Sequence, residues 1–144
     1  MAVREAELAV ATRLADVGPA MEQLRRLLPD WLEDDERNTI ELALAEAITN
    51  IIEHGFGGDT DEKVHLRVLE RPGALEIDLW DKGQPIPPGK LEEADADTTF
   101  AYDPTDLAAL PEGGMGLALI KSAFNEVRYG SRGGVNRLRL VKRI

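Results

Sequence analysis

The sequence contains no cysteine, which excludes disulfide bonds, thiolate nucleophiles and metal sites built on cysteine. It has only two histidines, His54 and His65, too few for a histidine-rich metal site. No uncharged apolar run approaches the length that spans a bilayer, so we expect no membrane segment. The first ten residues, MAVREAELAV, carry acids and lack the apolar core of a signal peptide. These absences favour a cytoplasmic protein.

Basic residues are also fewer than acidic ones: the chain has 17 lysines and arginines and 27 aspartates and glutamates, which gives a net charge of −10. A chain this acidic is repelled by phosphate backbones, so we expect no direct nucleic-acid binding. Many of the basic residues gather near the end of the chain, where we interpret them as the solvated face of a sheet. They are Arg128, Arg132, Arg137, Arg139, Lys142 and Arg143.

What the sequence does contain is ordinary for a globular protein: 43% hydrophobic and 31% charged residues, without internal repeats or a linker. We therefore expect a single domain over residues 1–144. Apolar residues alternate in strand-like segments and recur at helical spacing in others. The expected strands lie near 3–12, 63–71, 74–81, 125–130 and 136–144, and the expected helices near 16–29, 34–54 and 116–124. This order predicts an α+β two-layer sandwich, a mixed β-sheet with helices on one face.

Residues 84–113 hold most of the prolines and show no sustained hydrophobic period. A loop of this length inside a compact domain is uncommon and is often functional, so we expect a lid here. Short helical turns are possible within it, near 91–94 and 105–110.

Three polar residues occur four positions apart in the second expected helix: Glu46, Asn50 and His54. Each step of four advances about 40° around a helix, so these side chains form one narrow polar stripe. The opposite arc is apolar, which indicates that the helix packs on a core. An acid and an amide in line on a docked helix are candidates for binding a ligand.

Two glycine-containing segments follow. Asp81 continues the inward phase of its strand and is followed by Gly83 and Pro85, and an acid at an inward position is a departure from pattern that often marks a site. The second segment, Gly113-Gly114-Met115-Gly116-Leu117, enters a helix. Exposed N–H groups at such an entry form a ready phosphate site.

Together and in this order, these segments resemble the motifs of the Bergerat-fold ATPases, the superfamily that includes gyrase, histidine kinases and MutL. Glu46 and Asn50 match its N box, Asp81 and Gly83 its first glycine box, and residues 114–117 its second. The resemblance implies the histidine-kinase-like ATPase fold, with ATP and Mg²⁺ as ligands.

Within the superfamily, the sequence is most similar to the anti-sigma-factor serine/threonine kinases. His54-Gly55 follows the N box as in that group, and Pro85 stands where gyrase-like members have a second glycine. Many relatives carry threonine or serine in the last strand near the nucleotide, whereas this chain has Asn136, whose role we leave open. Lid contacts between Ile86 and Pro111 also stay unassigned.

The resemblance implies a role for each matched residue. Asn50 would ligate Mg²⁺, Glu46 would act as general base, and Asp81 would accept the adenine amino group. Gly83 would let the base approach the backbone. His54 is placed near the nucleotide by the resemblance, although a role at the helix C-terminus is an open alternative. Residues expected to bring N–H groups to the phosphates are Gly114, Met115, Gly116 and Leu117.

The function that the resemblance implies is partner switching by a serine/threonine protein kinase. Such a kinase transfers the γ-phosphate of ATP to a serine of a STAS-domain anti-sigma antagonist and holds a sigma factor or another target. Homodimers are usual in this group, with Arg67, Trp80 and Arg137 as possible contacts on an exposed sheet face. One alternative is an ATP-gated binding module with little or no kinase activity. Another is a catalytic domain that serves a phosphoacceptor histidine on a separate chain.

Overall fold

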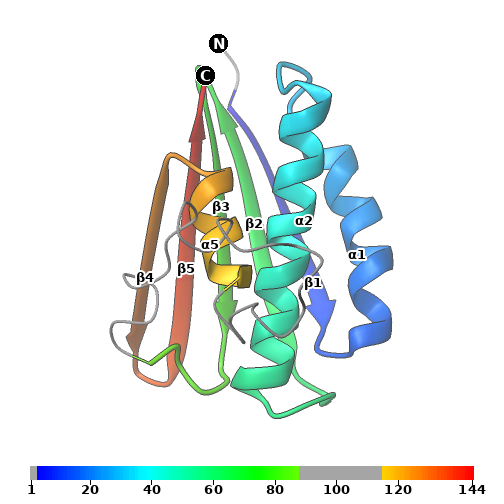
Figure 1. The fold of residues 1–144 in the computed structure, drawn as a ribbon, viewed down its shortest axis with the longest axis vertical. Coiled ribbons are helices and arrows are strands. Elements are labelled where there is room, and N and C mark those ends of the chain that lie inside the picture. Colours follow the sequence, from blue (N-terminus) through cyan, green and yellow to red (C-terminus); the bar gives the residue numbers. More distant parts are fainter. Residues whose placement is uncertain (1–2, 88–114) are drawn as a thin grey trace, which may run out of the picture.

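A computed structural model describes residues 3–87 and 115–144. One five-stranded sheet, in the order β1-β2-β3-β5-β4, lies behind three helices that cover a single face (Figure 1). Along the chain the elements are β1 (Arg4–Ala11), α1 (Leu14–Leu27), α2 (Asp34–Asn50), η1 (Ile51–Gly55), β2 (Lys63–Arg71), β3 (Ala74–Asp81), α5 (Met115–Ala123), β4 (Glu126–Arg132) and β5 (Val135–Arg143). The expected α+β two-layer sandwich is confirmed.

The sheet differs from the expected mixed sheet in one respect, because every strand pair in the described residues is antiparallel. β3 and β4 run in the same direction, but β5 is inserted between them and pairs with both. The two strands connected through α5 are therefore never neighbours, and the parallel contact that a crossover usually creates does not form.

The core lies between the inner face of the sheet and the helices. On α2 the buried residues recur at helical spacing, as in Ile40, Leu44 and Ile48, all at most 1% exposed. On β3 the inner row is Leu75, Ile77 and Leu79, each fully buried. Both patterns agree with the sequence periodicity. Within the described residues, none of the helices has the length and apolar character that crossing a bilayer requires.

The helix α2 begins at Asp34, and Glu33 is its N-cap. The backbone N–H of Glu33 donates to Glu36 Oε1 at 3.0 Å, so Glu36 reaches back over the first turn. This bond lowers the pKa of Glu36 against the opposing effect of desolvation, and Lys142 lowers it further. Acids in this turn also suit the helix dipole.

Of the expected lid, only its beginning, residues 84–87, belongs to the described part of the chain. The rest of the lid, including the possible helical turns near 91–94 and 105–110, lies outside it, as does Gly114. Met115 and Gly116 open α5.

Candidate functional site

A cavity of about 370 Å³ opens between the end of α2, the end of β3 and the start of α5. This volume lies within the usual range of small-molecule sites. Its wall is mostly apolar, with a few polar groups. The residues that line it are Ala47, Asn50, Ile51, His54, Gly55, Asp81, Gln84, Pro85, Ile86, Pro87, Leu117, Ile120, Tyr129 and Leu138.

The sequence predicts one helix from about residue 34 to 54, but in the structure this helix is α-helical only as far as Asn50. It widens into the π-helical turn η1, in which the N–H of Phe56 donates to the carbonyl of Ile51 at 3.0 Å. Such turns occur frequently at functional sites. Asn50, the last residue of α2, and His54, within η1, both line the cavity. Two members of the expected stripe therefore meet at one site.

Asp81 is held at the cavity by a buried hydrogen-bond network. It is 7% exposed, and its Oδ1 accepts the N–H of Gly83 and the Nδ2 of Asn136, both at 2.9 Å. The same Nδ2 also donates to the carbonyl of Gly83 at 2.8 Å. Asn136 faces Asp81 across the β3–β5 ladder and is 1% exposed. Because both contacts use Oδ1, Oδ2 receives no hydrogen bond from the described residues.

Asn136 thus has a structural role that the sequence left open. Its amide clamps the carboxylate of Asp81 and the main chain of Gly83 together, so the acid has one orientation. The signal in the sequence was its position: Asn136 has the inward phase of Leu138 and Leu140, where an apolar residue is expected.

Gly83 packs directly on the helix end. A Cβ at Gly83 would lie 2.8 Å from the carbonyl carbon and oxygen of Gly55, closer than real Cβ atoms come. The N–H of Gln84 donates to the same carbonyl at 2.7 Å. The space beside Gly83 is therefore taken by the main chain of Gly55, and the approach of a base to Gly83 stays a prediction.

Tyr129 and Ile86 were not singled out in the sequence. The hydroxyl of Tyr129 accepts the N–H of Ile86 at 2.8 Å, which attaches the beginning of the expected lid to β4. Burial raises the pKa of Tyr129, the negative charge of Asp81 adds to that rise, and the bond from Ile86 opposes it. Tyr129 has the inward phase of Val127, so a hydroxyl facing the core was the available signal.

The remaining predicted residues divide into two groups. Leu117 is 6% exposed and lines the cavity from α5. Glu46 does not line the cavity; it lies one turn before Asn50 on α2, half-buried, without a hydrogen bond or ion pair to another described residue. In the described ranges, no three histidine, aspartate or glutamate side chains gather as a metal site. The neutral oxygen of Asn50 nevertheless suits a hard cation that takes its other ligands from phosphate and water.

Comparison with known proteins gives relatives that are named serine-protein kinases and anti-sigma factors. The chain is 32% identical over 103 residues to a serine-protein kinase RsbW of Bacillus pumilus (strain SAFR-032), covering 70% of this chain and 62% of that protein. It is 29% identical over 122 residues to an anti-sigma F factor of Geobacillus kaustophilus (strain HTA426), covering 85% of this chain and 70% of that one. The chain therefore spans about three fifths of the length of the first of these relatives.

A solved structure supports the fold. The crystal structure of the RsbU and RsbW domains of Rv1364c from Mycobacterium tuberculosis superposes with a TM-score of 0.64 and 16% identity. The match covers 97% of this chain and 32% of that one. A family model described as the histidine kinase-like ATPase domain matches residues 10–142, nearly the whole chain. The chain belongs to the histidine kinase-like ATPase domain family.

Proposed function

We propose that the cavity binds the adenine of ATP, with Asp81 as the acceptor of its exocyclic amino group. The observation that carries this proposal is the buried network of Asp81, Asn136 and Gly83, which uses Oδ1 and leaves Oδ2 to a ligand. A hydrogen bond to a charged acceptor contributes about 1.5–3 kcal/mol. Guanine carries a carbonyl oxygen in place of the amino group, so the same carboxylate would repel GTP.

The phosphates would extend from the adenine along the end of α2. Asn50 lies on the wall of the same cavity, and its amide oxygen would be a ligand of Mg²⁺. The ion, when bound, neutralises charge on the phosphate oxygens. The other contacts would come from the segment that enters α5, because the backbone N–H groups of Met115, Gly116 and Leu117 would donate to the phosphates. We expect the same of Gly114, which lies outside the described residues.

Glu46 would act as the general base. Without a partner among the described residues, its carboxylate is available to take the proton of a serine hydroxyl while that oxygen attacks the γ-phosphorus. The bond from the γ-phosphorus to the bridging oxygen breaks, and ADP leaves. Such a base contributes typically ~10²–10⁴-fold to the rate.

The substrate and partners are inferred from the names of the relatives, which are a serine-protein kinase and an anti-sigma factor. We infer that the chain phosphorylates a serine on a STAS-domain anti-sigma antagonist. In this scheme it holds a sigma factor or another regulated target in the cytoplasm, as a homodimer, until the unphosphorylated antagonist displaces that target.

Transfer of label from γ-labelled ATP to a purified STAS-domain antagonist tests the kinase proposal. We expect wild type to label a serine, and Glu46→Gln to label it at a rate lower by about 10²-fold or more. The matched control is Glu53→Gln, because Glu53 is an exposed acid two turns further along that does not line the cavity. Phosphoserine survives acid whereas phosphohistidine does not, so acid treatment identifies transfer to a histidine. Equal labelling by wild type and Glu46→Gln contradicts the assigned base.

One observation favours a second candidate function. Because Glu46 lies outside the lining of the cavity, the chain would also suit an ATP-gated binding module that does not transfer phosphate. For such a module, ATP binds and the partner is retained only with ATP, but no phosphoserine accumulates. The same labelling experiment, combined with partner retention under ATP and under ADP, separates the two.

A further inference from the structure

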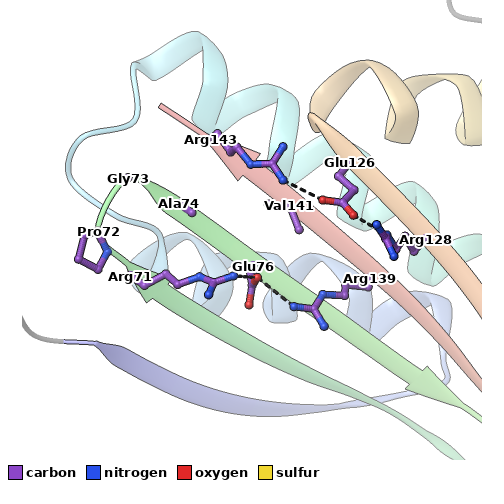
Figure 2. A pocket seen from close by; sticks show the side chains of 10 residues that line it. All are labelled: Arg71, Pro72, Gly73, Ala74, Glu76, Glu126, Arg128, Arg139, Val141 and Arg143. Carbon is purple, nitrogen blue, oxygen red and sulfur yellow. Dashed lines mark hydrogen bonds and ion pairs between the residues drawn. The ribbon is translucent and has the colours of Figure 1, made fainter.

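One face of the sheet is not covered by any helix of the described residues, and it carries many of the arginines of this acidic chain (Figure 2). They alternate with inward apolar residues along β2, β4 and β5, as in Arg139 between Leu138 and Leu140. Two acids on this face are buried, since Glu76 is 4% and Asp78 2% exposed. Trp80 is half-buried instead of exposed, because the guanidinium of Arg137 lies 5.3 Å from the centre of its ring.

At one end of this face, arginines and glutamates form two triads. In the first, Glu76 Oε1 accepts from Arg71 and, at 2.9 Å, from Arg139. In the second, Glu126 accepts from Arg128 through one oxygen and from Arg143, at 2.9 Å, through the other. Figure 2 shows the two glutamates pointing toward their arginines from β3 and β4.

The strand register places the triads side by side. Glu76 and Glu126 both face Val141 of β5, so they stand in one row across three strands. Two strand spacings separate them, roughly 10 Å. Between the triads the side chains are small, with Val141, Ala74 and Gly73 among the residues that line a hollow of about 630 Å³. The φ of +76° at Gly73 makes the tight turn that borders this hollow.

The charges of this hollow do not balance. Each triad has two guanidinium groups and one carboxylate, so each carries an excess of one positive charge, and together they carry two. Hydrogen bonds from Arg128 and Arg143 lower the pKa of Glu126, and Glu76 raises the pKa of Arg139. The excess charge therefore persists around neutral pH. Each guanidinium has five N–H donors, so most of them are not used by the two glutamates.

We propose that this hollow, lined by the Glu76 and Glu126 triads, is a docking site for an acidic segment of a partner protein. Guanidinium groups bind carboxylates in a planar, bidentate manner, and an excess of two positive charges matches a segment with two or more acidic side chains. Among the described residues, no aromatic side chain lines the hollow to stack on a base. The net charge of −10 also opposes an extended polyanion such as nucleic acid.

The proposed docking site is separate from the nucleotide cavity. The hollow borders the start of β3 at Ala74 on the uncovered face, whereas Asp81, at the other end of that strand, faces the cavity. No lining residue is shared. The test of binding to the hollow therefore needs no ATP.

Fluorescence anisotropy with the full chain tests the proposal. The probe is a labelled eight-residue peptide of alternating glutamate and alanine, and the reference is the same peptide with glutamine in place of glutamate. We expect the glutamate peptide alone to bind at low salt and to dissociate as sodium chloride shortens the Debye length from about 10 Å at 0.1 M to 3 Å at 1 M. Equal binding of the two peptides, or tighter binding of duplex DNA, overturns the proposal.

Variants identify the hollow as the site. Arg128 and Arg143 are 75% and 56% exposed, so the double replacement Arg128→Gln/Arg143→Gln removes charge without opening the core. We expect it to weaken peptide binding roughly tenfold. The matched control, Arg26→Gln on α1, removes an exposed arginine outside the hollow and leaves the affinity unchanged.

A third variant works in the opposite direction. Glu126→Gln increases the excess charge of the hollow from two to three, so we expect the peptide to bind more tightly than to wild type. This result keeps the test decisive even where the double variant fails to fold. Weaker binding by Glu126→Gln, or full displacement of the peptide by an equal concentration of inorganic phosphate, contradicts a site built for an acidic segment.

Discussion

Replacing Gly83 by alanine tests the contact between the helix end and the strand end that form the cavity. The added Cβ would lie 2.8 Å from two atoms of Gly55 and 3.0 Å from its Cα, and all three belong to the main chain. The segments must therefore move apart, and overpacking of this kind costs about 1–3 kcal/mol. Stretching the 2.7 Å hydrogen bond from Gln84 to Gly55 adds about 1 kcal/mol. We expect Gly83→Ala to lose about 2–4 kcal/mol of unfolding free energy.

Urea denaturation followed by circular dichroism measures this loss, and Gly55→Ala is the matched control. A Cβ at Gly55 would lie 3.6 Å from the carbonyl oxygen of Gln84 and 3.7 Å from the side chain of Ile51, which are ordinary contacts. We expect that variant to change stability by less than about 1 kcal/mol. Because Asp81 accepts the N–H of Gly83, Gly83→Ala should also weaken ATP binding. Equal losses in the two variants would refute the proposed packing.

Three further changes follow from single contacts. Asn136→Ala removes the amide that holds Asp81 and Gly83 together, so we expect it to destabilise the fold by roughly 2–4 kcal/mol and to weaken ATP binding. Urea denaturation measures the stability and calorimetry the affinity. An unchanged affinity for ATP contradicts the clamp. Tyr129→Phe removes the acceptor of the Ile86 N–H and should lower the free energy of unfolding by about 1 kcal/mol. Hydrogen exchange at the Ile86 amide measures the loss of this bond, and an unaltered protection of that amide contradicts it. Glu36→Ala removes a carboxylate whose pKa is lowered in the folded state. Glu36 therefore contributes about 1 kcal/mol to stability at pH values above the ordinary carboxyl pKa, and this contribution disappears as the pH falls through the lowered pKa. The thermal melts of the variant and of wild type should converge as the pH falls through the lowered pKa of Glu36, and a gap that stays constant into the acid range would argue against the cap.

Alternation and helical spacing were sufficient to predict most elements of the fold. β2 and β3 follow the expected inward rows, and α2 buries the expected arc, because each element has one side against a single core. Asp81 was found by its departure from this rule. An acid at an inward position needs partners, and the structure supplies them from Asn136 and Gly83.

The features that could not be predicted depend on contacts between distant segments. The π turn η1 ends at Gly55, whose carbonyl accepts an N–H from Gln84, and no local pattern near residue 55 encodes that partner. The same holds for Asn136, which lies 55 residues from Asp81 in the chain. The sheet is antiparallel because β5 lies between β3 and β4. The hydrophobic periodicity within a single strand does not specify which strands are its neighbours.

Calorimetric titration with Mg²⁺ and ATP is the most direct test that the cavity at Asn50 and Asp81 is a nucleotide site. We expect ATP to bind wild type and the control Asp34→Asn, which changes an exposed acid in the first turn of α2. Asp81→Asn should bind at least tenfold more weakly, because it replaces the charged acceptor of the adenine amino group. No heat of binding to wild type, or equal affinity of wild type and Asp81→Asn, would contradict the account.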